Sequence, residues 1–285
     1  MNYVNCKLCP RQCGADRTQG SLGYCKAPAG AVVSKTMLHK WEEPILAPGG
    51  KSGAIFFGGC NLGCVYCQNY AISRTAQGRQ MDGAALRAEM ENLISQGAEN
   101  IDLVSPTPYL PTVLEALSAP LCVPVIYNTG GYERKEAIAA LEEKVDIYLP
   151  DLKYADAGLA GSLSAAPDYF PVATEAIGEM VRQVGKPLFQ ADKLLKGVVI
   201  RHLILPGQIE NSLKVLDWIG DTFAPGQVLV SLMRQYTPTP GMQPPLDRSV
   251  TEEEYQAVLS WMYLNGIEGF TQEASSSGTT FIPDF

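Results

Sequence analysis

The sequence predicts an α/β protein, a partial (β/α)6 TIM-like barrel preceded by a small cysteine-rich module. From residue 53 onward, short apolar runs alternate with amphipathic segments, as expected for parallel strands joined by helices. Seven of the eight cysteines lie within the first 67 residues, which sets the N-terminal part apart. At 285 residues and 46% hydrophobic, the chain is long enough for one large barrel with a small module or for two ordinary domains, and the cysteine distribution favours the first. We therefore expect a cysteine-rich metal-binding domain at 1–50 and a barrel with a C-terminal extension at 51–285.

Six apolar runs predict the strands of the barrel, and a weaker run near the end predicts a seventh. The expected strands are residues 54–58, 100–104, 123–127, 145–149, 198–204, 227–232 and, as the seventh, 267–271. The expected helices between them are residues 82–96, 111–118, 133–143, 168–184, 209–219 and 251–264. Thr251 and Glu254 have the spacing of a capping box at the start of the last helix. In such barrels the functional groups gather at the carboxyl ends of the strands.

The overall charge excludes some classes of partner. The formal net charge is -8 and the pI is about 4.9, whereas proteins that bind nucleic acids or membrane surfaces use basic patches. The first residues lack the pattern of a signal peptide, and no apolar run approaches the roughly 20 residues of a membrane helix. We therefore expect a cytoplasmic protein that binds neither nucleic acid nor membrane.

Three cysteines lie on one loop directly after the first predicted strand. Cys60, Cys64 and Cys67 are soft thiolate ligands of the kind that bind iron-sulfur clusters or zinc. A 4Fe-4S cluster normally takes four ligands, so three local cysteines leave one iron open for chemistry. The alternatives are a zinc site, which would make the chain a zinc-binding interaction protein, or buried free thiols in a metal-free barrel enzyme. A structural zinc needs a fourth ligand, and no histidine lies within 20 residues of Cys67.

The N-terminal module contains a second group of four cysteines. Cys6, Cys9, Cys13 and Cys25 suffice for one complete metal site, and metal binding is the better expectation than disulfides in a cytosolic protein. The site suits a structural zinc or an auxiliary iron-sulfur cluster equally well. Cys122, the remaining cysteine, is expected to be a small buried residue in the core.

The spacing of the loop cysteines resembles a known signature. Cys60, Cys64 and Cys67 form the pattern CxxxCxxC with the aromatic Tyr66 before the last cysteine, as in the radical S-adenosylmethionine superfamily. The resemblance implies a partial six-unit barrel with a 4Fe-4S cluster on this loop. It also implies that the amino and carboxylate groups of S-adenosylmethionine chelate the open iron, and that reduction cleaves this cofactor to a 5'-deoxyadenosyl radical.

Given this resemblance, polar residues at the other strand ends become candidate cofactor groups, together with Tyr66. Ser105 and Thr107 follow the second strand, where the superfamily often has a glycine-rich segment; here they are candidates for the oxygens that hold the cofactor's amino group. The alternative is a simple proline-containing turn. Asn128 and Thr129 follow the third strand, just before a flexible Gly-Gly turn, and suit a ribose contact.

The fourth and fifth strands supply charged candidates. Asp151 and Lys153 point to the same side by the period-two rule, and a carboxylate with an ammonium suits the zwitterionic methionine end of the cofactor. The alternative is an ordinary salt bridge. On the fifth strand Arg201 and His202 alternate, so one faces the barrel interior and the other faces the helices; His202 is our candidate for the cofactor site.

A finer resemblance is to the pyruvate formate-lyase activating enzymes. It rests on Cys67-Gln68-Asn69, Asp151-Leu152-Lys153 and Leu205-Pro206-Gly207. The pattern from Cys6 to Gly14 resembles an uncharacterised activating-enzyme-like group with an N-terminal four-cysteine module. The resemblance implies a flavodoxin or ferredoxin as electron donor and a glycyl residue of a partner enzyme as a candidate substrate. A small molecule or another peptide is the alternative substrate.

Overall fold

The core of the molecule is a largely parallel sheet, as predicted. The computed structural model describes residues 1–40, 43–239 and 241–272, so the expected C-terminal extension beyond residue 272 lies outside the described residues. Seven strands pair in parallel in the order β10-β9-β8-β6-β5-β4-β2. Their bounds are β2 (Ser52–Phe57), β4 (Asn100–Val104), β5 (Val125–Thr129), β6 (Ile147–Pro150), β8 (Lys193–Leu203), β9 (Leu229–Met233) and β10 (Gly269–Thr271).

These seven strands are the seven apolar runs, which confirms the α/β fold class. The strand expected at 123–127 begins two residues later, at Val125, because Pro124 has no N–H to donate to the sheet. Asn128 and Thr129 are therefore the last residues of β5 rather than the first residues of the following loop.

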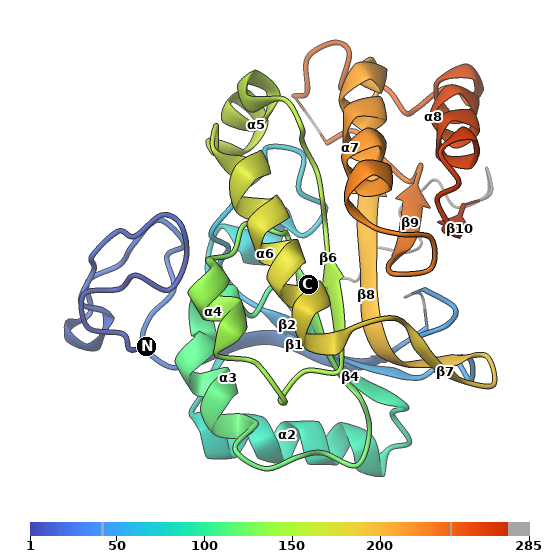
Figure 1. Ribbon diagram of the computed structural model, residues 1–285. Helices are drawn as coiled ribbons and strands as arrows, with labels where there is room; N and C mark the ends of the chain where they lie inside the picture. Colours follow the sequence, from blue (N-terminus) through green and yellow to red (C-terminus); the bar gives the residue numbers. More distant parts are fainter. Residues whose placement is uncertain (41–42, 240, 273–285) are drawn as a thin grey trace.

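Helices cover the outer face of the sheet, each between two strands (Figure 1). The six expected helices are α2 (Gly83–Ser95), α3 (Leu110–Ala116), α4 (Lys135–Ala139), α6 (Tyr169–Val184), α7 (Ile209–Thr222) and α8 (Glu252–Leu264). α4 is much shorter than predicted, and the chain adopts a left-handed conformation soon afterwards at Glu143. The prediction did not include α1 (Tyr70–Ser73), α5 (Ala157–Ser164) or the short turns η1 (Arg17–Gln19) and η2 (Thr107–Tyr109).

No helix in the described ranges is long and apolar enough to cross a membrane.

The serines and glycines of α5 explain why its sequence did not predict a helix. Asp156 nevertheless caps this helix by accepting a hydrogen bond from Leu159 N at 2.7 Å.

The N-terminal segment contributes to the sheet as well as to the cysteine-rich part. Residues 31–39 form β1 (Ala31–His39), which pairs antiparallel with β2 and with β3 (Arg79–Met81). The residues before β1 form a lobe beside α3 and α4 (Figure 1). The division of the chain at residue 50 stays a prediction, and the structure adds that β1 is a strand of the main sheet. A further strand, β7 (Leu188–Gln190), forms a hairpin with β8.

The predicted capping box at the start of α8 is present. Thr251 Oγ1 accepts a hydrogen bond from Glu254 N at 3.2 Å, and Glu254 returns one by accepting from Thr251 N at 2.9 Å. We expect Thr251→Ala to lower the free energy of unfolding by about 1 kcal/mol, because an N-terminal N–H of the helix loses its acceptor. Urea unfolding followed by circular dichroism measures this. Thr251→Ser keeps the hydroxyl, so an equal loss in that variant would contradict the explanation.

Candidate active site

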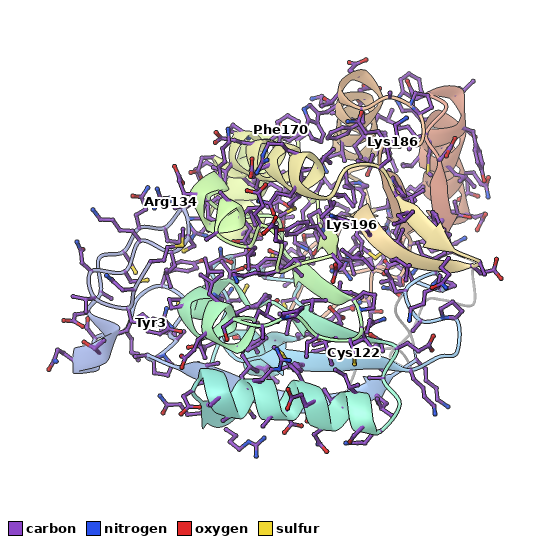
Figure 2. The ribbon with its side chains drawn as sticks, turned by 60° about the horizontal axis from the view of Figure 1, so that its bottom comes forward. Tyr3, Cys122, Arg134, Phe170, Lys186 and Lys196 are labelled. Carbon is purple, nitrogen blue, oxygen red and sulfur yellow. The ribbon has the colours of Figure 1, made fainter. Side chains whose placement is uncertain are left out.

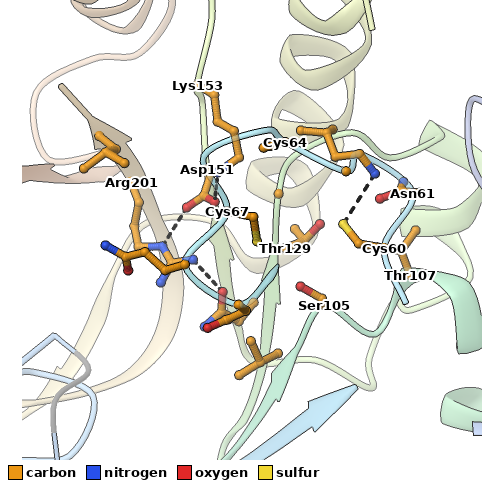
Figure 3. A pocket seen from close by; sticks show the side chains of 18 of the residues that line it. Cys60, Asn61, Cys64, Cys67, Ser105, Thr107, Thr129, Asp151, Lys153 and Arg201 are labelled. Atoms are coloured by element: carbon orange, nitrogen blue, oxygen red, sulfur yellow. Dashed lines mark hydrogen bonds and ion pairs between the residues drawn. The ribbon is translucent and has the colours of Figure 1, made fainter. Parts of the chain in front are cut away.

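The loop of residues 58–69, which follows β2 and is called the cluster loop below, lines a cavity at the carboxyl end of the sheet. The cavity has a volume of about 240 Å³, and Cys60, Cys64 and Cys67 all line it (Figure 3). Tight turning of the loop requires positive φ at Gly59 (79°) and Gly63 (67°), which glycine adopts without strain. The structure thus brings the three predicted cysteines to one cavity. No group of three or more His, Cys, Asp or Glu side chains in the described residues is already arranged around a single metal position.

Two thiols of the cluster loop, those of Cys60 and Cys67, lie in surroundings that disfavour a bare thiolate. Burial raises the pKa of Cys60 to about 12, and its nearness to Cys64 and Cys67 raises it further. Burial, with Cys64 nearby, also raises the pKa of Cys67. Clustered buried thiols of this kind become thiolates when a metal compensates their charge. The donor set therefore fits an iron-sulfur cluster with three cysteine ligands.

A chain of hydroxyl groups leads to one of these thiols. Ser164 Oγ, at the end of α5, donates to Cys64 Sγ at 3.0 Å. Tyr154 OH lies 2.7 Å from Ser164 Oγ, and Tyr66 OH lies 2.6 Å from Tyr154 OH. Tyr66, a predicted cofactor residue, lines the cavity while its hydroxyl is held by Tyr154. Hydrogen bonds to a ligand sulfur are among the interactions that tune a metal site.

Part of the cavity wall is charged (Figure 3). Lys153 Nζ lies 2.5 Å from Asp151 Oδ2, and Arg201 Nε lies 2.9 Å from Asp151 Oδ1. Arg201 also donates to Asn128 Oδ1 at 2.6 Å. Burial on its own would raise the pKa of Asp151, but the charges of Arg201 and Lys153 outweigh it and lower the pKa. The wall therefore carries one carboxylate and two cations, of which the sequence analysis assigned only Asp151 and Lys153.

Two threonines of the cavity share a buried carboxyl group that the sequence analysis missed. Thr107 and Thr129 both donate their hydroxyl hydrogens to Glu133 Oε1, the second at 2.5 Å. Burial raises the pKa of Glu133 to about 7, although both hydrogen bonds oppose the rise. A carboxylate only accepts hydrogen bonds, so the threonine oxygens keep lone pairs for the cavity. Glu133 was predicted as the first residue of a helix, and nothing in its spacing marked it.

A glycine turn connects β5 to this carboxyl group and to the charged wall. Gly131 has φ of 81°, and a Cβ at this position would lie 2.2 Å from Asp151 O and 2.8 Å from Tyr169 OH. Tyr169 OH accepts from Lys153 N at 3.0 Å and lies 2.7 Å from Asp151 O. The end of β6 is therefore held directly against the Gly131 turn.

Of the other predicted cofactor residues, four line the cavity and one does not. Ser105, with φ of 59°, lines the cavity, as do Thr107, Asn128 and Thr129. His202 does not: it is fully buried on the other face of β8, where Nδ1 donates to Leu152 O at 2.7 Å and Nε2 accepts from Ser212 Oγ at 2.9 Å.

The placement of His202 corrects our choice between the two alternating residues of β8. Arg201 is the one that faces the cavity, while burial lowers the pKa of His202 to about 4 and keeps its ring neutral. His39, at the end of β1, also lines the cavity. One further expectation changes: Cys122 was expected in the core but is exposed.

The four N-terminal cysteines lie outside this cavity. Cys6 and Cys25 are buried, Cys9 is partly buried and Cys13 is exposed. Burial raises the pKa of Cys9 to about 12, and the neighbouring Cys25 adds to the rise. They form a second thiol group, which packs against the cluster loop: a Cβ at Gly59 would lie 2.6 Å from Cys25 O.

The chain matches one family model and is similar to an archaeal protein. The family model of the radical SAM superfamily matches residues 54–219, which is more than half of the chain and includes the whole cluster loop. An uncharacterized protein of Methanocaldococcus jannaschii, MJ0674, is 29% identical over 271 residues, covering 90% of this chain and 74% of the relative.

Two solved structures share the fold. A radical SAM methyltransferase from Sphaerobacter thermophilus has a TM-score of 0.53 at 16% identity and covers 79% of this chain and 69% of its own. HydG, a maturase of the FeFe hydrogenase, has a TM-score of 0.50 at 13% identity and covers 74% of this chain and 49% of its own. At these identities the likeness concerns the fold alone.

The two glycines after β5 offer a matched test of the site's geometry. We expect Gly131→Ala to lower the free energy of unfolding by about 2 kcal/mol or more, because the methyl group meets Asp151 O in a left-handed backbone. A Cβ at Gly130 meets only Lys153 Cε at 3.8 Å, an ordinary contact, so Gly130→Ala should be much milder. Urea unfolding of both variants measures the difference. Equal losses would show that the close approach at Gly131 is unimportant.

Proposed function

This chain belongs to the radical SAM superfamily, and from that premise we propose that Cys60, Cys64 and Cys67 hold its 4Fe-4S cluster. The observation that supports the assignment most directly is that three thiols of one loop and the charged side chains of Asp151, Lys153 and Arg201 line a single cavity. When bound, the cluster and S-adenosylmethionine supply a 5'-deoxyadenosyl radical that abstracts hydrogen from a substrate. The family match covers all three cysteines, which favours this assignment over a zinc-binding interaction protein.

The protein's own residues then bind and orient the cofactor. Asp151 pairs with an ammonium group of a ligand, while Lys153 and Arg201 pair with a carboxylate, so the wall suits the zwitterionic methionine end. Thr107 and Thr129 offer hydroxyl oxygens whose hydrogens are already donated to Glu133. We propose that these oxygens accept hydrogen bonds from the amino group or the ribose hydroxyl groups of the cofactor. Ser105, Asn128 and Tyr66 complete the lining.

For the substrate, we propose a glycyl residue on a loop of a partner enzyme, as in the activating enzymes that the sequence resembles. Support comes from Cys67-Gln68-Asn69 and Asp151-Leu152-Lys153, both of which line or border the cavity. The sheet offers additional support, because the described strands pair from β10 to β3 in an open path and not in a closed ring. A small molecule or another peptide remains the competing substrate. The proposed electron donor is a flavodoxin or a ferredoxin.

The cluster assignment predicts a specific loss of reactivity. We expect Cys64→Ala to reduce dithionite-driven formation of 5'-deoxyadenosine to background, because the cluster loses one of three protein ligands. Cys122→Ala is the control, since Cys122 is exposed, does not line the cavity and lies away from the N-terminal lobe (Figure 2). Product is quantified by chromatography on protein purified and reconstituted without oxygen. A Cys64→Ala variant with full cleavage activity would falsify the assignment.

We further propose that Cys6, Cys9, Cys13 and Cys25 hold a second metal, either zinc or an auxiliary iron-sulfur cluster. On protein purified without oxygen, about four irons with one zinc per chain indicate one cluster plus a structural zinc, and about eight irons indicate two clusters. Cys25→Ser should remove the second metal, while Cys60, Cys64 and Cys67 still take up iron. Elemental analysis with electron paramagnetic resonance measures both. A wild-type chain with four irons and no further metal would contradict the proposal of a second metal site.

A further inference from the structure

We infer that Arg11 is a positioning residue through which the N-terminal four-cysteine lobe fixes the backbone of the cluster loop. Arg11 lies between Cys9 and Cys13 in the sequence. Its side chain leaves the lobe and donates from Nε to Asn61 O at 2.9 Å and from Nη2 to Leu62 O at 3.3 Å. These two carbonyls belong to the short segment between Cys60 and Cys64.

The same guanidinium also holds the end of helix α5. Arg11 Nη2 donates to Ser164 O at 2.9 Å, and Nη1 donates to Ala165 O. The last carbonyls of a helix have no partner within the helix, and a cation is well suited to satisfy them. Ser164 is the residue whose hydroxyl donates to Cys64 Sγ. One side chain therefore fixes both the loop that carries the thiols and the helix end that hydrogen-bonds to one of them.

Two aromatic residues fix the guanidinium, and both also contact the cluster loop. The Arg11 guanidinium carbon lies 4.0 Å from the centre of the Tyr24 ring and 5.1 Å from that of Tyr132. Tyr24 OH donates to Leu62 O at 3.0 Å, and the backbone oxygen of Tyr132 accepts from Asn61 Nδ2 at 2.6 Å. A planar guanidinium stacks on aromatic rings and carries five N–H donors, whereas an ammonium has three donors and no planar face.

This arrangement couples the two cysteine groups. Arg11 lies between two of the N-terminal cysteines, and Tyr24 is adjacent to a third, Cys25. A metal that orders the segment from Cys9 to Cys25 also orders the cluster loop through Arg11, a step that rests on the proposed function. Coupling of this kind is reciprocal, so each site raises the affinity of the other for its metal. The N-terminal lobe is then a positioning element of the radical site as well as a metal-binding one.

The test compares two arginines that both join the lobe to the barrel. Arg11→Met removes the bonds to the cluster loop. Arg134→Met is the matched control, because Arg134 lies on the lobe side of the barrel, where it donates to Lys7 O at 2.8 Å and pairs with Glu136 at 3.1 Å (Figure 2). The readout is the rate at which an iron chelator removes iron from the reconstituted protein, together with the electron paramagnetic resonance spectrum of the reduced cluster with and without S-adenosylmethionine.

We expect Arg11→Met to lose cluster iron about tenfold faster than wild type and to show an altered spectrum, whereas Arg134→Met should behave as wild type. Wild-type rates in Arg11→Met, or equal effects of the two variants, would overturn the inference. If Arg11→Met does not fold, as judged by circular dichroism, Arg11→Lys decides: faster iron loss supports the inference and a wild-type rate overturns it.

The role of the lobe's own metal is tested with Cys25→Ser, alone and combined with Arg11→Met. Because both changes break the same connection, the double variant should lose iron no faster than whichever single variant loses it faster. Independent, multiplying effects would contradict the coupling. The proposed function fails in a different way, namely if wild-type protein binds no iron at the cluster loop at all.

Discussion

The ion pairs of Asp151 set the conditions for the rest of the cavity. A buried carboxylate is costly unless cations flank it, and here Lys153 comes from the same strand end while Arg201 comes from the neighbouring strand. The backbones are tied as well, since Leu152 N donates to Arg201 O at 2.8 Å. A slip of β8 by one residue would put the neutral ring of His202 in the cavity and remove one cation from Asp151. The register of β6 and β8 is therefore a condition for the charged wall.

The two acidic residues of the site differ because their partners differ. Asp151 is flanked by cations and its pKa falls, whereas Glu133 has two threonine hydroxyls as partners and its pKa rises to about 7. Neutral hydrogen bonds compensate a buried charge less than opposite charges do. Asp151 thus presents a charge to a ligand, while Glu133 acts indirectly by orienting Thr107 and Thr129. The cavity thereby combines an ion-paired wall with a hydrogen-bonding one.

The sequence predicts the parts of this site that depend on local pattern. Apolar runs located all seven parallel strands, and the loop cysteines and Asp151 with Lys153 were identified from their spacing at strand ends and from their resemblance to known motifs. Alternation showed that either Arg201 or His202 faces inward, but the choice depends on register, which is a property of the pairing with β6. Glu133 was missed because it was taken as the first residue of a helix, whereas its contact with Thr107 joins the ends of two strands across 26 residues of sequence. β1 was missed because its polar residues and its place after the cysteines hid the period-two pattern.

The N-terminal lobe shows why a domain boundary is hard to locate from composition. Before β1 it has no strand of its own, so contacts with the barrel stabilise it: Tyr3 OH lies 2.6 Å from Thr112 Oγ1, and the buried Arg17 donates to Pro108 O at 2.5 Å. Arg17 also lies 3.9 Å from Cys6 Sγ and stacks on Tyr3. Arg17 joins the Cys6 end of the lobe to the barrel, and Arg11 joins the segment between Cys9 and Cys13 to the cluster loop. A metal bound by these cysteines would therefore stabilise the interface between lobe and barrel. Loss of that metal would leave the cluster loop less well ordered.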